Sequence, residues 1–131
     1  MIQSLSANIL LAHGSRDPKW QAPFEAIKDM IKQQAQQNAI DSHLAMPVEL
    51  AYMELCEPSL ERMCEQLALE GYQQINIYPL FFAAGRHLRI DVPQQLTQIE
   101  NKLGIKTLLH PPVGQKSIVQ EAVSKVILQQ L

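Results

Sequence analysis

The stretch that decides the fold runs from residue 8 to residue 18 and reads NILLAHGSRDP. Residues 8–12 form a mostly apolar run of the kind found in strands that are covered on both faces, and the run stops abruptly at His13. Gly14 follows, and glycine lets the backbone turn without steric cost. The stretch therefore predicts a buried strand whose carboxyl end presents an imidazole.

A second segment repeats this arrangement further along the chain. Residues 75–82 read INIYPLFF and lead into AAGRH at 83–87. A strand is predicted at 74–80, so that His87 also follows a strand candidate. Two more strands are predicted at 48–52 and 106–109. Apolar stripes with helical spacing alternate with the strands: Trp20, Phe24, Ile27 and Ile31; Leu60, Met63, Cys64 and Leu67; Val92, Leu96, Ile99 and Leu103; Ile118, Ala122 and Val126.

This alternation predicts an α/β fold, a three-layer sandwich in which helices cover both faces of a four-stranded, mostly parallel sheet. In a flavodoxin-like strand order, 2-1-3-4, the strands that precede His13 and His87 are neighbours. Ligands of such sheets bind beyond the carboxyl ends of the strands, where the strand order reverses. We therefore expect the two imidazoles to meet at one edge of the sheet.

Length and composition exclude several classes of protein. The 131 residues fit one domain spanning 1–131, and 47% hydrophobic residues argue for a folded core. A net charge of -2 gives no reason to expect nucleic-acid binding. The N-terminal apolar run is too short for a signal sequence or a membrane span, so we expect a cytoplasmic protein. Cys56 and Cys64 are expected to be buried thiols on one helix.

Residues near the predicted edge favour a metal and an anionic ligand. Glu54 lies two residues past the second strand, and two histidines with one carboxylate form a sound site for a labile divalent metal. Glu57 is an alternative carboxylate. Arg16, Arg86 and Arg89 lie close to the two histidine segments in the sequence and indicate an anionic ligand. His43 is interpreted as a surface residue and His110 as part of a structural loop.

Other chemistry has less support. The chain has neither a Walker-type phosphate loop nor a G-x-G-x-x-G fingerprint, so dependence on a nucleotide is not expected. Ser15 lies beside His13, but no G-x-S-x-G elbow surrounds it. A hydrolase or transferase with His13 as its nucleophile is a further alternative.

Three consecutive motifs carry a specific resemblance: LAHGSRDP at 11–18, ELCEPSL at 54–60 and PLFFAAGRHLRIDVP at 79–93. The chain resembles the class II tetrapyrrole chelatases of the CbiX/SirB type, the sirohydrochlorin cobaltochelatases and ferrochelatases, in their short single-domain form. The resemblance covers essentially the whole chain. It departs from the family pattern at Arg86, because a Gly commonly precedes the second histidine. Arg86 adds a cation that can pair with a carboxylate.

The resemblance implies ATP-independent insertion of Co²⁺ or Fe²⁺ into sirohydrochlorin or a related tetrapyrrole, for cobalamin or siroheme biosynthesis. It implies that His13, His87 and Glu54 are the catalytic and metal-binding residues. Arg16, Arg86 and Arg89 would pair with the acetate and propionate groups of the macrocycle. It also implies a homodimer, with no permanently bound cofactor. A non-catalytic carrier of a divalent metal or of a tetrapyrrole is the alternative.

Overall fold

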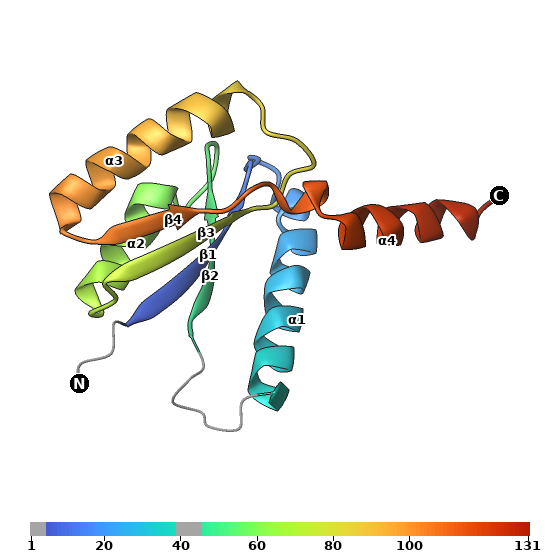
Figure 1. The fold of residues 1–131 in the computed structure, drawn as a ribbon, viewed down its shortest axis with the longest axis horizontal. Coiled ribbons are helices and arrows are strands. Elements are labelled where there is room, and N and C mark those ends of the chain that lie inside the picture. The colour runs from blue at the N-terminus through green and yellow to red at the C-terminus, as the bar shows by residue number, and fades with distance from the viewer. Residues whose placement is uncertain (1–4, 39–45) are drawn as a thin grey trace.

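The computed structural model describes residues 5–38 and 46–131, and their arrangement is shown in Figure 1. His43 lies outside the described residues. One parallel sheet has the order β2-β1-β3-β4, which confirms the predicted fold class and strand order. The strands lie close to the predicted positions and are β1 (Ser6–Ala12), β2 (Val48–Tyr52), β3 (Gln74–Pro79) and β4 (Lys106–Leu109).

The register of the three neighbouring strands brings their carboxyl ends level. Ala12 at the end of β1 pairs with Tyr52 at the end of β2, and Leu11 pairs with Pro79 at the end of β3. The residues that follow these strands therefore leave the sheet at the same edge. This edge is the carboxyl edge, and it is where a ligand of an open parallel sheet is expected.

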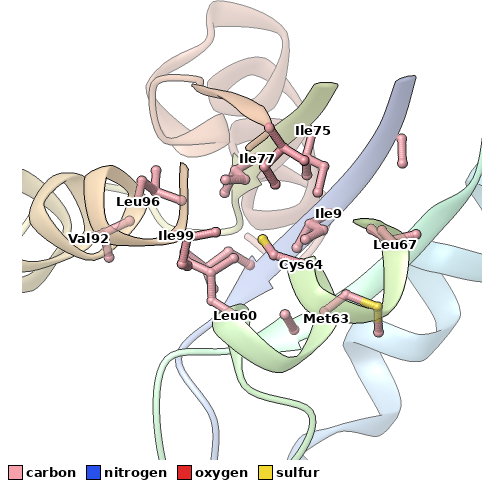
Figure 2. Packing of buried hydrophobic residues seen from close by; sticks show 14 of the residues in the cluster. Ile9, Leu60, Met63, Cys64, Leu67, Ile75, Ile77, Val92, Leu96 and Ile99 are labelled. Carbon is pink, nitrogen blue, oxygen red and sulfur yellow. The ribbon is translucent and has the colours of Figure 1, made fainter. Parts of the chain in front are cut away.

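The main core lies between the sheet and the helices α2 (Leu60–Leu69) and α3 (Val92–Leu103), as Figure 2 shows. Alternate residues of β1 and β3 face these helices, as the period of a strand requires. The fully buried members of this cluster include Ile9, Leu11, Ile75, Ile77, Leu60, Cys64, Leu67, Val92 and Ile99. The apolar stripes predicted for these two helices are confirmed.

The two cysteines lie in different settings, so the prediction that both belong to one helix is wrong. Cys64 is buried on α2, and burial raises the pKa of its thiol to about 12. Cys56 is half-buried in the loop before α2, because that helix begins only at Leu60, with Ser59 as its N-cap.

The opposite face of the sheet is covered by α1 (Ala22–Asn38), whose Phe24 and Ile31 pack against Leu10 and Leu50. A short 3₁₀ helix, η1 (Pro18–Trp20), precedes it, and the Asp17 carboxylate caps η1 by accepting from Lys19 N at 3.0 Å. The turn between η1 and α1 breaks the predicted apolar stripe. Trp20 is therefore 65% exposed instead of facing the core.

The last helix departs from the predicted packing. Another 3₁₀ helix, η4 (Val113–Gln115), leads into α4 (Ser117–Leu128), and α4 projects away from the sheet (Figure 1). None of its residues is buried, although an apolar stripe runs along it. The predicted stripe exists, but in this chain it does not cover the sheet. Within the described ranges, no helix is long and apolar enough to cross a membrane.

The packing of the main core predicts how much stability is lost when one buried methyl group is removed. Ile9 is fully buried in the centre of the sheet, and we expect Ile9→Val to lower the free energy of unfolding by about 1 kcal/mol because a methyl-sized void remains. Ile27→Val is the matched control, since Ile27 is 39% exposed; its effect is expected within about 0.5 kcal/mol. Urea denaturation of both variants measures the difference, and equal effects would contradict this picture of the core.

Candidate functional site

His13 and Glu54 are brought together by backbone pairing that continues past the ends of β1 and β2. Met53 N donates to Ala12 O at 2.9 Å, and Glu54 N donates to His13 O at 3.1 Å. These bonds hold the two loops side by side at the carboxyl edge. The prediction that Glu54 is the carboxylate beside the first histidine therefore agrees with the geometry.

The side chains of this pair are in direct contact. His13 Nε2 lies 2.9 Å from Glu54 Oε1, and each side chain is about half exposed. His13 Nδ1 lies 3.1 Å from the carbonyl oxygen of Gly14. A contact of this length is a hydrogen bond when Nε2 carries a proton, and a divalent ion would take the place of that proton between the ring nitrogen and the carboxylate. A nitrogen and an oxygen donor for a divalent ion thus already lie next to each other.

Gly14 is required for this approach. Its φ is +103°, and a Cβ atom at this position would lie 1.9 Å from Glu54 O. Leu55, directly after Glu54, has a φ of +70°, a conformation that is strained for a residue with a branched side chain. The loop that carries Glu54 is therefore held in an unusual shape against the His13 loop.

His87 has a carboxylate partner of its own. It begins a single π-helical turn, η3 (His87–Asp91), and its Nδ1 lies 2.8 Å from Asp91 Oδ2. Such an acceptor fixes the ring and leaves Nε2 to meet a metal or a proton. Asp91 does not cap α3 through its side chain. Its role beside His87 was not predicted, although an i, i+4 spacing of His and Asp was visible in the sequence.

The predicted site residues follow three neighbouring strands, but their side chains form two separate pairs, and the second pair contains Asp91, which was not predicted. The expected meeting of the two imidazoles around one ion therefore stays a prediction. Glu54, His13 and His87 follow β2, β1 and β3, which are adjacent strands. No group of three or more His, Cys, Asp and Glu side chains that could hold a metal ion occurs among residues 5–38 and 46–131. His13 contacts Glu54, and His87 contacts Asp91.

The alternative carboxylate, Glu57, is otherwise engaged. Its Oε2 accepts a hydrogen bond from Ser59 N at 3.1 Å, just before α2 begins. Glu57 thus organises the start of the helix, and Glu54 is the carboxylate beside His13.

The three predicted arginines remain available to a ligand. Arg16 lies in the loop after β1, whereas Arg86 and Arg89 flank His87, and all three are exposed. None of them forms an ion pair within the part of the chain that the structure describes. Unpaired guanidinium groups near the histidines fit a ligand that carries several carboxylates.

Aromatic side chains complete the carboxyl edge. Trp20 is 65% exposed and Phe82, in the loop between β3 and η3, is 68% exposed. A small cavity of about 110 Å³ beside His13 is lined in part by Trp20, Phe24 and Tyr52. The cavity is too small to enclose a tetrapyrrole macrocycle. Burial raises the pKa of the Tyr52 hydroxyl, which has no hydrogen-bond partner among the described residues.

Comparison with known proteins agrees with these features. Residues 7–130 match the CbiX family. The chain belongs to this family. The sirohydrochlorin cobaltochelatase of Sulfurisphaera tokodaii is 30% identical over 94% of this chain and 88% of that protein. The sirohydrochlorin ferrochelatase of Bacillus subtilis is 26% identical, over 89% of this chain and 42% of that protein.

Solved structures agree with the fold of the CbiX family. The putative cobalamin biosynthesis CbiX protein of Marinobacter aquaeolei is 34% identical to this chain and superimposes on it with a TM-score of 0.79. The alignment covers 95% of this chain and 96% of that protein. SirB of Bacillus subtilis subspecies spizizenii, solved in complex with cobalt, has a TM-score of 0.76 at 24% identity. The alignment covers 95% of this chain and 50% of SirB. The family resemblance inferred from the three motifs is confirmed.

The pairing of His87 with Asp91 makes a testable claim. We expect Asp91→Asn to weaken Co²⁺ binding about 10- to 100-fold, because the amide is a poorer orienting partner for the imidazole than a carboxylate. Calorimetric titration with Co²⁺ measures the change. Asp29→Asn is the matched control. Asp29 is exposed and lies in the middle of α1, outside the loops that carry the two histidines. Unchanged Co²⁺ affinity in Asp91→Asn would contradict this role.

Proposed function

We propose that this protein is a metal chelatase that inserts Co²⁺ or Fe²⁺ into sirohydrochlorin without using ATP. The observation that carries the proposal is the contact of 2.9 Å between His13 Nε2 and Glu54 Oε1 at the carboxyl edge. His13 and Glu54 follow β1 and β2, and β1 is the neighbour of β3, the strand that leads to His87. The names of the similar CbiX proteins support the substrate class, and the exposed aromatic and arginine side chains at the edge fit a flat polyanion.

Metal insertion needs two things from the protein. The divalent ion must be held weakly while it exchanges its ligands, and two pyrrole N–H protons must leave the macrocycle. In our proposal His13, Glu54 and His87 bind the incoming ion. As the ion passes to the macrocycle, Nε2 of each imidazole regains a free lone pair and accepts one of the two pyrrole protons as a general base. Binding by all three requires His87 to approach the His13–Glu54 pair.

The macrocycle is held by its charged rim. Arg16, Arg86 and Arg89 pair with the acetate and propionate groups, since guanidinium binds carboxylate through two parallel hydrogen bonds. Trp20 and Phe82 contact the apolar ring surface. Arg86 adds a cation next to the second histidine.

The same proposal covers the setting of the reaction. We propose that residues 1–131 act as a single domain, that the protein works in the cytoplasm as a homodimer, and that the reaction serves cobalamin or siroheme biosynthesis. The metal is a substrate, and no other cofactor is needed. The order of affinities of nitrogen and oxygen sites for divalent ions favours Ni²⁺ and Cu²⁺, so the ligands alone do not select Co²⁺ or Fe²⁺.

The deciding experiment compares Co²⁺, Fe²⁺ and Ni²⁺ as substrates with purified protein and sirohydrochlorin under anaerobic conditions. Absorbance of the macrocycle follows metal insertion. We expect turnover with Co²⁺ or Fe²⁺, well above the rate without protein and unchanged by added ATP. Stoichiometric binding of the metal or the tetrapyrrole with no acceleration would identify a carrier instead and would overturn the proposed enzyme.

A further inference from the structure

Tyr52, the last residue of β2, carries a buried hydroxyl group that has no hydrogen-bond partner among the described residues. Only 2% of the residue is exposed. Burying a polar group without a partner costs free energy, and such groups are nearly always paired in folded proteins. Phenylalanine would fill the same space without that cost. The hydroxyl therefore points to an acceptor that comes from a ligand.

The ring of Tyr52 lines the small cavity of about 110 Å³ beside His13. Side chains alternate along a strand, so Tyr52 faces the same side of the sheet as Leu50, which packs against Phe24 of α1. Phe24 lines the cavity as well. A space of this size has room for several water molecules or for one group the size of acetate.

The cavity lies at the N-terminus of α1, a helix of 17 residues. Gln21, which directly precedes the helix, and Phe24 in its first turn are both lining residues. The aligned peptide dipoles give this end of the helix a partial positive charge, which favours an anion. Phe24 N and Glu25 N already donate to Gln21 O, and Pro23 has no N–H group. The helix thus supplies positive potential, and a side chain must supply the hydrogen bond.

The ionisable groups around the cavity are compatible with a bound carboxylate. Burial, and after it the Glu25 carboxylate, raises the pKa of the Tyr52 hydroxyl, so this group stays protonated and can donate. The charge of Glu25 is offset by Lys28, whose Nζ lies 3.1 Å from Glu25 Oε2. Arg16 adds an exposed cation in the segment that leads from β1 to the helix. A protonated donor in a positive potential selects an anionic acceptor.

We propose that this cavity binds one carboxylate arm of the tetrapyrrole and that the Tyr52 hydroxyl donates a hydrogen bond to it. The inference deepens the proposed function and rests on it for the identity of the ligand. His13 also lines the cavity. An arm at the rim of the macrocycle can therefore enter while the centre of the ring lies near the imidazole. The arginines bind arms that stay at the surface, whereas Tyr52 fixes the rotation of the ring by holding the arm that enters.

The fluorescence of Trp20 tests the carboxylate site without metal or macrocycle. Trp20 is the one tryptophan of the chain, and it lines the cavity. At constant ionic strength, we expect acetate to change its emission in a saturable way and the neutral analogue acetamide to have no such effect. Tyr52→Phe should weaken acetate binding at least about 10-fold, because a hydrogen bond to a charged group is lost.

Tyr78→Phe is the matched control for this titration. It removes a hydroxyl group from β3, and Tyr78 is not among the residues that line the cavity. We expect this variant to bind acetate like the wild type. Equal acetate affinities in Tyr52→Phe and the wild type, or an equal response to acetamide, would overturn the carboxylate site.

Metal-free sirohydrochlorin tests whether the bound carboxylate is an arm of the macrocycle. We expect Tyr52→Phe to weaken its binding about 10-fold, measured by absorbance, and we expect acetate to compete with it in the wild type. Acetate binding that depends on Tyr52, combined with an unchanged affinity for the macrocycle, would assign the site to a free carboxylate. That result would overturn the proposed arm.

Thermal unfolding of Tyr52→Phe separates ligand binding from a structural role. In buffer without acetate, we expect the variant to be at least as stable as the wild type, because its hydroxyl has no protein partner to lose. A lower melting temperature would reveal such a partner and contradict the proposal. A protein that binds acetate through Tyr52 but inserts no metal would refute the proposed function and leave the carboxylate site standing, so the two failures are distinguishable.

Discussion

His13→Ala is expected to lower the rate of metal insertion into sirohydrochlorin by at least about 100-fold. The substitution removes the nitrogen that contacts Glu54 Oε1 at 2.9 Å, which is the proposed metal ligand and proton acceptor. The side chain is about half exposed, so its loss leaves the core intact, and the unfolding midpoint should hardly move. Initial rates from absorbance, at saturating Co²⁺ or Fe²⁺, measure the effect.

His110→Phe is the control for the loss of an imidazole at the same edge. His110 follows β4, and its ring stacks on Tyr78 with the centroids 4.2 Å apart and the planes at 12°. Phenylalanine preserves this stack, and His110 Nε2 has no hydrogen-bond partner among the described residues. We expect the rate of metal insertion by the His110→Phe variant to match that of the wild type. Full activity in His13→Ala would refute the proposed mechanism, whereas equal losses in both variants would point to a general disturbance of the edge.

Gly14→Ala is expected to destabilise the fold by about 4 kcal/mol, which combines a strained backbone with overpacking. The alanine Cβ would lie 1.9 Å from Glu54 O, and the φ of +103° is unfavourable for any side chain. The loops of His13 and Glu54 must separate to accept it. Thermal unfolding measures the loss of stability, and metal titration should show weaker Co²⁺ binding in the fraction that remains folded.

Gly85→Ala separates this effect from glycine substitution in general. Gly85 precedes Arg86 in the other histidine loop, and a Cβ atom there would meet nothing within 4 Å. We expect its stability to change by less than about 1 kcal/mol, because the alanine is accommodated without strain. A Gly14→Ala variant as stable as Gly85→Ala would mean that the two loops are not locked together as described.

The sequence predicted the sheet well because its signal is local and strong. The apolar runs that end at His13 and Pro79 are bounded by polar residues, and alternation with helices left few topologies. The position of Glu54 was also predictable, since two residues past a strand in a parallel sheet must lie at the carboxyl edge. These predictions needed only the period of each segment and the handedness of crossovers.

Other features depend on tertiary contacts, which the spacing of apolar residues in the sequence does not predict. The stripe on α4 indicated a face to be covered, but not that the sheet of the same chain leaves it uncovered. The spacing of His87 and Asp91 did not reveal a π-helical turn that pairs their side chains at 2.8 Å. Cys56 was placed on a helix because an apolar stripe has no sharp start, whereas the Ser59 cap delays α2.

The level ends of β1, β2 and β3 have a thermodynamic consequence. His13 and Glu54 lie one and two residues past the ends of β1 and β2, and hydrogen-bonded core strands are expected to open only with the whole sheet. An ion held by both therefore stabilises the entire domain by mass action, and the melting temperature should rise with the logarithm of free metal. Tight retention of the ion would add stability but would oppose its transfer. In the proposed mechanism the two half-exposed donors hold the ion weakly, which favours turnover over storage.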